Sequence, residues 1–74
     1  MKILYTGSNG LLGQKISVAT VGYKQHSFLA TARGKNRTLN LGSASYASMD
    51  ITDAAAVKAV VKDFQPDVII HGAA

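Results

Sequence analysis

The sequence predicts an α/β fold in which a parallel sheet is covered by helices on both faces. Three observations support this prediction: four short apolar runs typical of strands, two stretches with helical spacing, and strands that are apolar throughout instead of alternating. Because parallel strands are joined by right-handed crossovers, this order of elements indicates the N-terminal half of a doubly wound sheet. At 74 residues the chain forms at most one small domain, so we expect the sheet to be incomplete.

The first unit is predicted to be a strand, a turn and a helix. Residues 2–6 form an apolar, β-branched run that is too short to nucleate a helix. Residues 7–10 read Gly-Ser-Asn-Gly, which is typical of a turn with positive φ angles. From residue 11 to about residue 21 apolar residues recur near helical spacing, and Gly22 is well placed to end the helix.

Two further strands are expected before the second helix. Residues 27–33 form a strand-like run, and the polar, basic residues 34–37 follow it as a loop. Residues 39–45 show little periodicity. A weaker third strand is predicted for residues 46–51, ending near Asp50.

The second helix is the clearest element of the sequence. Thr52 is its predicted N-cap, Asp53 is an acid in its first turn, and residues 54–64 continue it. Helical spacing places these apolar residues on one face: Ala54, Val57, Val60, Val61 and Phe64. Pro66 cannot continue the helix, and residues 67–71 are predicted to form a fourth strand with an apolar centre.

Composition restricts the classes of protein. Without cysteine there is no disulfide framework and no thiol nucleophile, and the first apolar run is too short for a signal peptide or a membrane span. We therefore expect a cytoplasmic protein that does not act at a membrane. Residues 1–49 carry six Lys or Arg and no acid, whereas residues 50–74 carry four Asp and two Lys. This asymmetry predicts an N-terminal half that receives an anion, with an ordinary solvated surface as the alternative.

The main candidate site is a G-x-x-G-x-x-G pattern at the first strand-to-helix junction. Gly7 permits a tight exit from the strand, Gly10 lets a pyrophosphate approach the backbone, and Gly13 permits close packing of helix on strand. The amides of Gly10, Leu11 and Leu12 are then expected to point at the anion, assisted by the helix dipole. A turn-rich loop without a ligand is the alternative. A P-loop is excluded because no lysine directly follows these glycines.

The end of the second strand bears on the choice of dinucleotide. In dinucleotide-binding folds an acid here holds the ribose 2′-hydroxyl of NAD, whereas an arginine accommodates the 2′-phosphate of NADP. This chain has Arg33 at that place and no acid before Asp50. We therefore expect NADP to be preferred over NAD, with Lys35 or Arg37 as a second cation. The alternative is a solvated basic loop, and nucleic acid is not expected because no stacking aromatic residues accompany these cations.

Two more groups complete the candidate site. Asp50 can accept a hydrogen bond from an adenine amino group, and Ile51 can form an apolar wall beside the ring. Alternatively, Asp50 only begins the entry to the second helix. Small residues that leave room for a ribose follow the fourth strand, at Gly72, Ala73 and Ala74. His71 is expected to satisfy a local partner. No catalytic residue and no metal site are predicted, because the histidines and aspartates are scattered.

Together these motifs resemble the N-terminal portion of the extended short-chain dehydrogenase/reductase family, within the NAD-dependent epimerase/dehydratase superfamily. The resemblance rests on residues 2–13, 49–53 and 65–74, and it is greatest to the dTDP-4-dehydrorhamnose reductase group. It implies a Rossmann fold that binds NADP or NAD. The residues that it assigns to the pyrophosphate, the adenine and the ribose are, in that order, Gly7, Gly10, Leu11 and Leu12, then Asp50 and Ile51, then Gly72, Ala73 and Ala74.

The resemblance also implies that the chain carries the cofactor half of an enzyme without its chemistry. The family's catalytic Tyr-x-x-x-Lys pair and the sugar-nucleotide site would lie beyond Ala74, so residues 1–74 would be inactive alone. The whole enzyme would transfer a hydride to the 4-keto group of a dTDP-sugar. His71 departs from the asparagine frequent at that position. The alternatives are an epimerase or dehydratase of sugar nucleotides, a non-catalytic NAD(P)-binding regulator, and a remnant that binds nothing.

Overall fold

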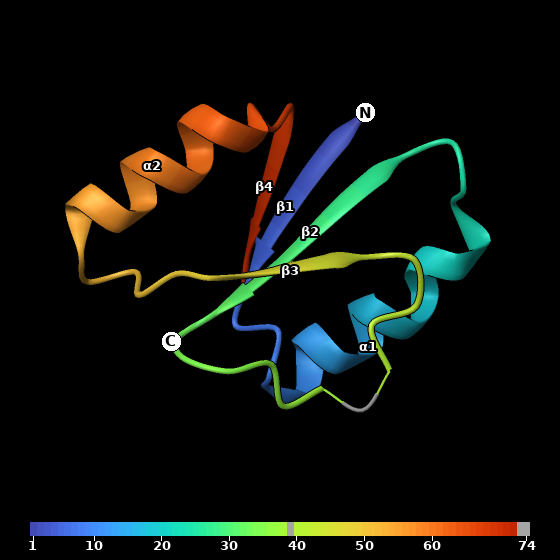
Figure 1. Cartoon of the computed structure of the whole chain (residues 1–74). Coiled ribbons are helices and arrows are strands. Elements are labelled where there is room, and N and C mark those ends of the chain that lie inside the picture. The colour runs from blue at the N-terminus through green and yellow to red at the C-terminus, as the bar shows by residue number, and fades with distance from the viewer. Residues whose placement is uncertain (39, 73–74) are drawn as a thin grey trace.

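A computed structural model describes residues 1–38 and 40–72. Within them one parallel sheet has the strand order β3-β2-β1-β4 (Figure 1). Its strands are β1 (Lys2–Thr6), β2 (Ser27–Ala32), β3 (Ser45–Ser48) and β4 (Val68–His71). The predicted α/β fold with half of a doubly wound sheet is confirmed. Because all four strands are parallel, their carboxyl ends meet at one edge of the sheet.

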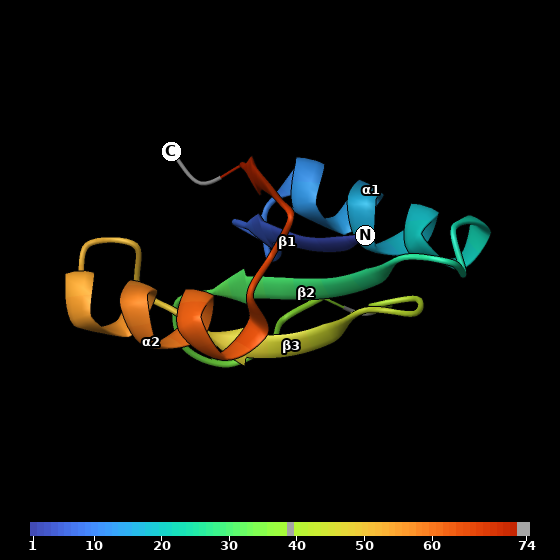
Figure 2. The ribbon, with the colours of Figure 1, turned by 90° about the horizontal axis from the view of Figure 1, so that it is seen from above.

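The two helices of the described residues lie on opposite faces of this sheet (Figure 2). They are α1 (Leu11–Ala19), which continues into the short 3₁₀ helix η1 (Thr20–Gly22), and α2 (Ala54–Phe64). Successive residues of β1 face opposite sides, as the pleat of a strand requires. Leu4 packs in the cluster that contains Val57, Val60 and Phe64 of α2, whereas Tyr5 packs in the cluster that contains Ile16 of α1.

Four predicted elements have bounds that are wrong by a few residues, and for β4 the difference is a start at Val68 instead of residue 67. α1 ends at Ala19 because the Thr20 hydroxyl donates to the carbonyl oxygen of Ser17 at 2.7 Å, and the chain then tightens into η1. β2 ends at Ala32 because Gly34, two residues on, turns the chain with a φ of 79°. β3 spans Ser45–Ser48 instead of residues 46–51, since this is the segment in register with Leu29–Ala32 of β2.

The predicted N-cap of α2 is also wrong. Asp53 fills that position, because one oxygen of its carboxylate accepts hydrogen bonds from the amides of Ala55 at 3.1 Å and Ala56 at 3.2 Å. Thr52 is instead turned toward Asp50. Sequence alone could not separate two adjacent residues that are both good caps.

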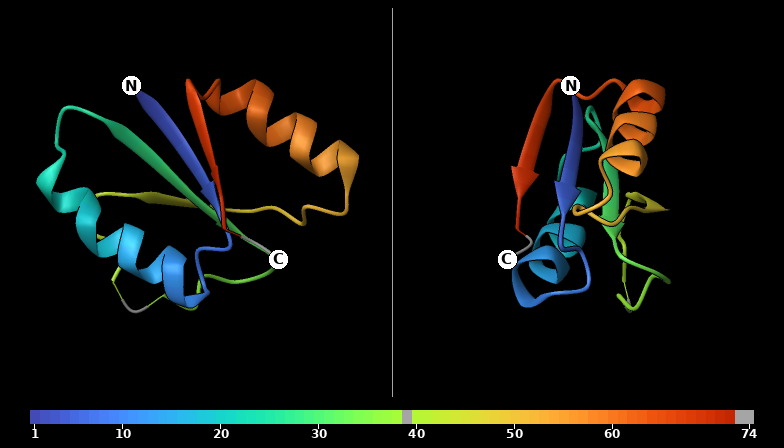
Figure 3. Two further views of the ribbon diagram at one scale, coloured as in Figure 1. Left: turned by 180° about the vertical axis from the view of Figure 1, so that it is seen from behind. Right: turned by 90° about the vertical axis from the view of Figure 1, so that its left-hand side faces the viewer.

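The edge strand β4 is less buried than its apolar centre predicts. It pairs with β1 alone, at the side of the sheet away from β2 (Figure 3). Val68, Ile69 and Ile70 are all exposed, Ile69 by 52 %. Helices on both faces therefore cover β1 and β2 well, while the described residues leave β4 largely open.

Candidate functional site

The turn that follows β1 is shaped by three glycines. Gly7 has a φ of 69°, which only glycine adopts without strain, and its carbonyl oxygen accepts the N–H of Gly10 at 2.9 Å. A Cβ on Gly13 would lie against the Gly7 carbonyl oxygen and 2.5 Å from the Cα of Ser8. A side chain is thus excluded at Gly13 by the backbone that α1 packs against. We call residues 7–10 the glycine turn.

The Gly10 amide differs from the sequence-based expectation. It was expected to point freely at an anion, but its N–H closes the glycine turn by donating to Gly7. The remaining expected amides are those of Leu11 and Leu12. They lie in the first turn of α1, where N–H groups have no acceptor within the helix, and the first helical bond joins Gln14 to Gly10 at 2.9 Å.

No side chain among the described residues caps the N-terminus of α1. No acidic residue lies in its first turn either, and the side chains of Leu11 and Leu12 are 75 % and 55 % exposed. A Cβ on Gly10 would lie in tight contact with the Gly7 carbonyl oxygen, at 3.3 Å, and would meet no other atom beyond its chain neighbours within 4 Å, so the rest of this face is open. Unpaired N–H groups and the positive end of the helix dipole make such an end suitable for an anion.

A loop with three cations follows β2. We call residues 33–37 the cationic loop, and its charges are those of Arg33, Lys35 and Arg37. Side chains of β3 fix its start: the Tyr46 hydroxyl donates to the Gly34 carbonyl oxygen at 2.7 Å, and the Gly34 amide donates to the Ser48 hydroxyl at 3.1 Å. Burial raises the pKa of Tyr46, so this phenol keeps the proton that it donates.

The Asn9 side chain joins the cationic loop to the glycine turn. Its Oδ1 accepts the Arg37 amide at 2.7 Å, and its Nδ2 donates to the Lys35 carbonyl oxygen at 3.2 Å. The Thr38 hydroxyl adds a bond of 2.7 Å to the Ser8 carbonyl oxygen. Sequence reasoning treated Asn9 only as turn chemistry and missed this bridge, because its partners lie 26 and 28 residues away.

A cavity of about 250 Å³ opens at the carboxyl ends of the strands. We call it the strand-end cavity, and it is lined by Gly7, Ala32, Arg33, Met49, Asp50, Ile51 and Thr52. Four of these residues, Gly7, Arg33, Asp50 and Ile51, were candidates from the sequence. Ala32, Met49 and Thr52 were not, and their position at the strand ends was the only signal that could have identified them.

The charge of Asp50 is stabilised inside this cavity. Its Oδ1 accepts the Thr52 hydroxyl at 2.7 Å and the Thr52 amide at 2.9 Å. These two bonds, and after them the nearby charge of Arg33, hold the pKa of Asp50 below its ordinary value. The carboxylate is therefore ionised at neutral pH, and Oδ2 takes no hydrogen bond from the described residues.

The ends of β1 and β4 form a second part of the site. The Thr6 hydroxyl lies 2.8 Å from Nδ1 of His71 and accepts the Gly72 amide at 3.1 Å. A Cβ on Gly72 would lie 3.0 Å from the Thr6 carbonyl oxygen, so the backbones approach closely here. Strand order reverses between β1 and β4, and in open α/β sheets ligands bind at such a switch point.

The expected residues do not all share one cavity. Gly10, Leu11, Leu12 and Gly13 belong to the start of α1, and Gly72 lies at the end of β4, so none of them lines the strand-end cavity. Gly7 is the first residue of the glycine turn and also lines the strand-end cavity. Ala73 and Ala74 lie outside the described residues.

Neither a metal-binding cluster nor a membrane-spanning helix occurs in the part of the chain that the structure describes. It contains no group of three or more His, Cys, Asp or Glu side chains arranged to hold a metal ion. None of its helices has the length and apolar character needed to cross a bilayer.

A model of the family described as RmlD substrate binding domain matches residues 1–74. The β subunit of methionine adenosyltransferase 2 from Xenopus tropicalis is 37 % identical over 73 residues, which is 99 % of this chain and 20 % of that protein. The same subunit from Xenopus laevis is 36 % identical, with the same coverage of both chains. The chain thus spans about one fifth of the length of these relatives.

Solved structures share the fold. An L-threonine dehydrogenase from Clostridium difficile superposes with a TM-score of 0.75 at 26 % identity, covering 95 % of this chain and 23 % of that one. A protein described as an epimerase from Burkholderia cenocepacia J2315 gives 0.81 at 24 % identity, with coverages of 99 % and 25 %. A dTDP-glucose 4,6-dehydratase from Bacillus anthracis, in complex with NAD, gives 0.78 at 20 % identity, with coverages of 100 % and 27 %. The last two are similar in fold alone.

Gly13→Ala is expected to destabilise the chain by about 1–3 kcal/mol, because its Cβ meets backbone that cannot move aside. Gly22→Ala is the matched control, since a Cβ there has no atom within 4 Å. Urea unfolding followed by circular dichroism gives both free energies of unfolding. Equal unfolding midpoints for the two variants would show that α1 does not depend on this close contact.

Thr52→Val removes a hydroxyl donor from Asp50, so we expect the pKa of Asp50 to rise toward its ordinary value of 3.8. Because the folded-state pKa is depressed, this interaction stabilises the fold fully above the ordinary, unfolded-state pKa of 3.8 and is lost as pH falls through the folded-state pKa. In the Thr52→Val variant this stabilisation should therefore be lost at a higher pH as the solution is acidified. Carbon-13 NMR titration of the Asp50 carboxyl measures this, with Thr52→Ser as the control that keeps the hydroxyl. An unchanged titration midpoint in Thr52→Val contradicts the assignment.

Proposed function

The chain belongs to the family described as RmlD substrate binding domain, and on this premise we propose that it is the dinucleotide-binding portion of an NAD(P)-dependent sugar-nucleotide reductase. The proposed reductase resembles the dTDP-4-dehydrorhamnose reductases, and the proposed location is the cytoplasm. The observation that carries the proposal is the uncapped N-terminus of α1 beside a cavity that holds both Arg33 and Asp50. A diphosphate and the adenosine that follows it require these two surfaces next to each other.

The residues present fit such a cofactor. The amides of Leu11 and Leu12 would bind the diphosphate, with the Gly10 position open so that it can approach. Ser8 supports this fit, because its buried hydroxyl takes no hydrogen bond from the described residues. A cavity of about 250 Å³ is smaller than the roughly 300–1,000 Å³ that accommodate a drug-sized ligand, which suits the adenosine half alone.

Within the cavity each expected residue has a proposed role. Oδ2 of the ionised Asp50 would accept the adenine amino group, and Ile51 would lie against the ring. Arg33 would pair with a 2′-phosphate, so NADP is proposed as the preferred cofactor, with NAD as the alternative. Gly72, with Ala73 and Ala74, would lie beside the ribose next to the nicotinamide.

The cofactor would supply the hydride, and the acid chemistry is assigned to residues outside this chain. None of its tyrosines is followed four positions later by lysine, as the family's catalytic pair requires. The hydroxyl of Tyr5 is buried against the Ser17 hydroxyl at 2.6 Å, and that of Tyr46 donates to Gly34. Residues 1–74 are therefore proposed to bind the cofactor and to have no catalytic residue of their own. The sugar nucleotide would bind elsewhere in the whole enzyme.

A second candidate function is a regulator that binds the dinucleotide without turning it over. The observation that favours it is the 36–37 % identity to proteins named as a β subunit of methionine adenosyltransferase 2. An epimerase or dehydratase of sugar nucleotides is a further alternative within the enzymes. A Tyr-x-x-x-Lys pair in the protein that carries these residues would favour an enzyme, and its absence would favour the regulator.

Gly10→Ala tests the proposed diphosphate site. The added methyl occupies the open face of the glycine turn, so we expect NADPH to bind at least about tenfold more weakly, or 1.4 kcal/mol. Amide shifts of Leu11 and Leu12 in nitrogen-15 NMR spectra, followed during titration with NADPH, report binding at the site itself. Gly22→Ala adds the same methyl in open space and should bind like the unaltered chain. Failure of the unaltered chain to bind millimolar NADPH would reject the proposed function.

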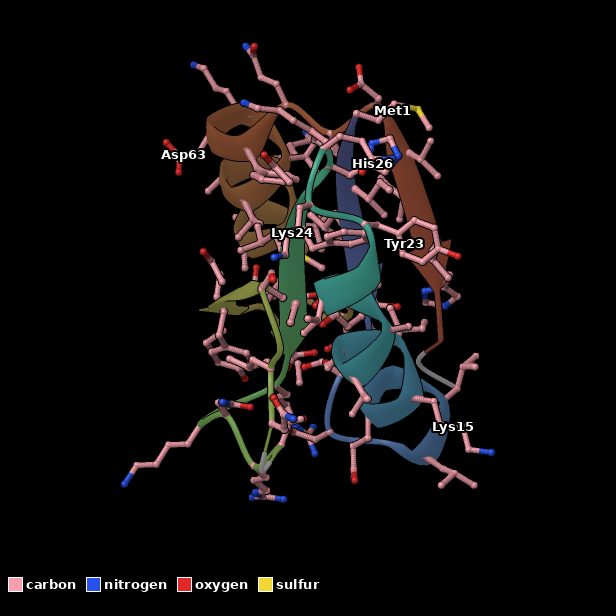
Figure 4. All side chains as sticks on the ribbon, turned by 90° about the vertical axis from the view of Figure 1, so that its right-hand side faces the viewer. Met1, Lys15, Tyr23, Lys24, His26 and Asp63 are labelled. Atoms are coloured by element: carbon pink, nitrogen blue, oxygen red, sulfur yellow. The ribbon has the colours of Figure 1, made fainter. Side chains whose placement is uncertain are left out.

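Arg33→Ala tests the preference for NADP. Loss of a charge-assisted contact with the 2′-phosphate should weaken NADPH binding about tenfold and leave NADH binding within a factor of about two. Lys24→Ala removes the same charge before β2, near the end of the sheet that carries Met1 and His26 (Figure 4), and should change neither affinity. Titrations with both cofactors give the ratio of the two dissociation constants. If Arg33→Ala does not change this ratio, Arg33 does not determine the cofactor preference.

A further inference from the structure

We infer that Asn9 is a positioning residue that sets the preference of this site for a 2′-phosphorylated dinucleotide. The inference rests on the proposed function. Asn9 would not touch the 2′-phosphate. It would hold the backbone of the cationic loop at a fixed distance from the glycine turn, so that the loop meets the 2′-phosphate of a ligand whose diphosphate lies at the start of α1.

The geometry places Asn9 between two segments that would bind different phosphates. On one side Asn9 directly precedes Gly10, the N-cap of α1. On the other side its amide group accepts from Arg37 at 2.7 Å and donates to Lys35 at 3.2 Å. Both partners are main-chain atoms of the cationic loop, so these bonds do not involve the side chains of Lys35 and Arg37.

The Thr38 hydroxyl, which donates to the Ser8 carbonyl oxygen at 2.7 Å, ties the residue after the loop to the glycine turn, but residues 33–37 themselves are held to that turn by the Asn9 side chain. Residues 33–37 contain no helix or strand, and Gly34 has a φ of 79°. Tyr46 and Ser48 hold Gly34 from the side of β3, whereas Asn9 holds the far half of the loop. A loop ordered before binding does not lose its conformational freedom at that moment, which favours affinity.

Asparagine suits this role chemically. Its amide offers an acceptor and a donor at the same time, which matches one backbone N–H and one backbone carbonyl oxygen. A carboxylate could accept from Arg37 but could not donate to Lys35. The amide is also neutral, so it leaves the positive charge of the loop undiminished beside an anionic ligand.

Asn9→Ala tests the inference, with Asn40→Ala as the matched control. Asn40 also accepts a backbone N–H, that of Gly42 at 2.8 Å, but its bond stays within its own loop. We expect Asn9→Ala to weaken NADPH binding about fivefold, which is the affinity equivalent of one net hydrogen bond of about 1 kcal/mol, while NADH binding changes by less than about twofold. Asn40→Ala should change neither. Faster hydrogen exchange at the Arg37 amide in Asn9→Ala would show directly that the bridge is lost.

The outcomes separate the inference from the proposed function. If the unaltered chain binds NADPH and Asn9→Ala weakens NADPH and NADH equally, Asn9 only supports the glycine turn, and the inference fails while the proposed function stands. The same holds if Asn9→Ala changes neither affinity. If the unaltered chain binds neither cofactor, both are rejected. The positioning role is supported only if Asn9→Ala weakens the binding of NADPH and not that of NADH, while Asn40→Ala weakens neither.

Discussion

The close approach of α1 to the turn after β1 is the contact on which the site depends. Gly13 packs against the backbone of Gly7 and Ser8 so tightly that no side chain fits between them. This contact fixes the start of α1 at the carboxyl end of β1, next to the ends of β2 and β3. Parallel pairing of β1 with both β2 and β4 then brings the strand-end cavity and the switch point to the same edge.

Much of this arrangement could be predicted from the sequence, because local patterns encode it. Apolar runs and helical spacing identified the four strands and the two α-helices of the described residues, though not η1, and the glycine spacing identified the turn. The details that failed depend on backbone geometry. The cap at Asp53 and the occupied amide of Gly10 are local bonds set by how the backbone turns, whereas the bridge of Asn9 joins segments 26 and 28 residues apart. A residue pattern indicates that a turn is present but does not specify which of its polar groups are bonded.

The fourth strand, β4, is more exposed than its apolar sequence predicts. Its apolar centre is typical of a strand buried on both faces, yet Ile69 is half exposed and β4 pairs only with β1. The sequence of an edge strand normally carries charged or otherwise protective residues, and Val68, Ile69 and Ile70 carry none. The apolar pattern is thus typical of a strand paired on both sides, whereas within the described residues β4 is paired on one side.

Charge in the strand-end cavity explains why the neighbouring loop would decide between dinucleotides. Asp50 is ionised there, and the charge of Arg33 in the same cavity is the smallest of the causes that lower the pKa of Asp50. Arg33 would therefore keep its attraction for a 2′-phosphate, and Lys35 and Arg37 would add to it because Asn9 holds their main chain toward the glycine turn. Selectivity would depend both on Arg33 and on where the loop is held.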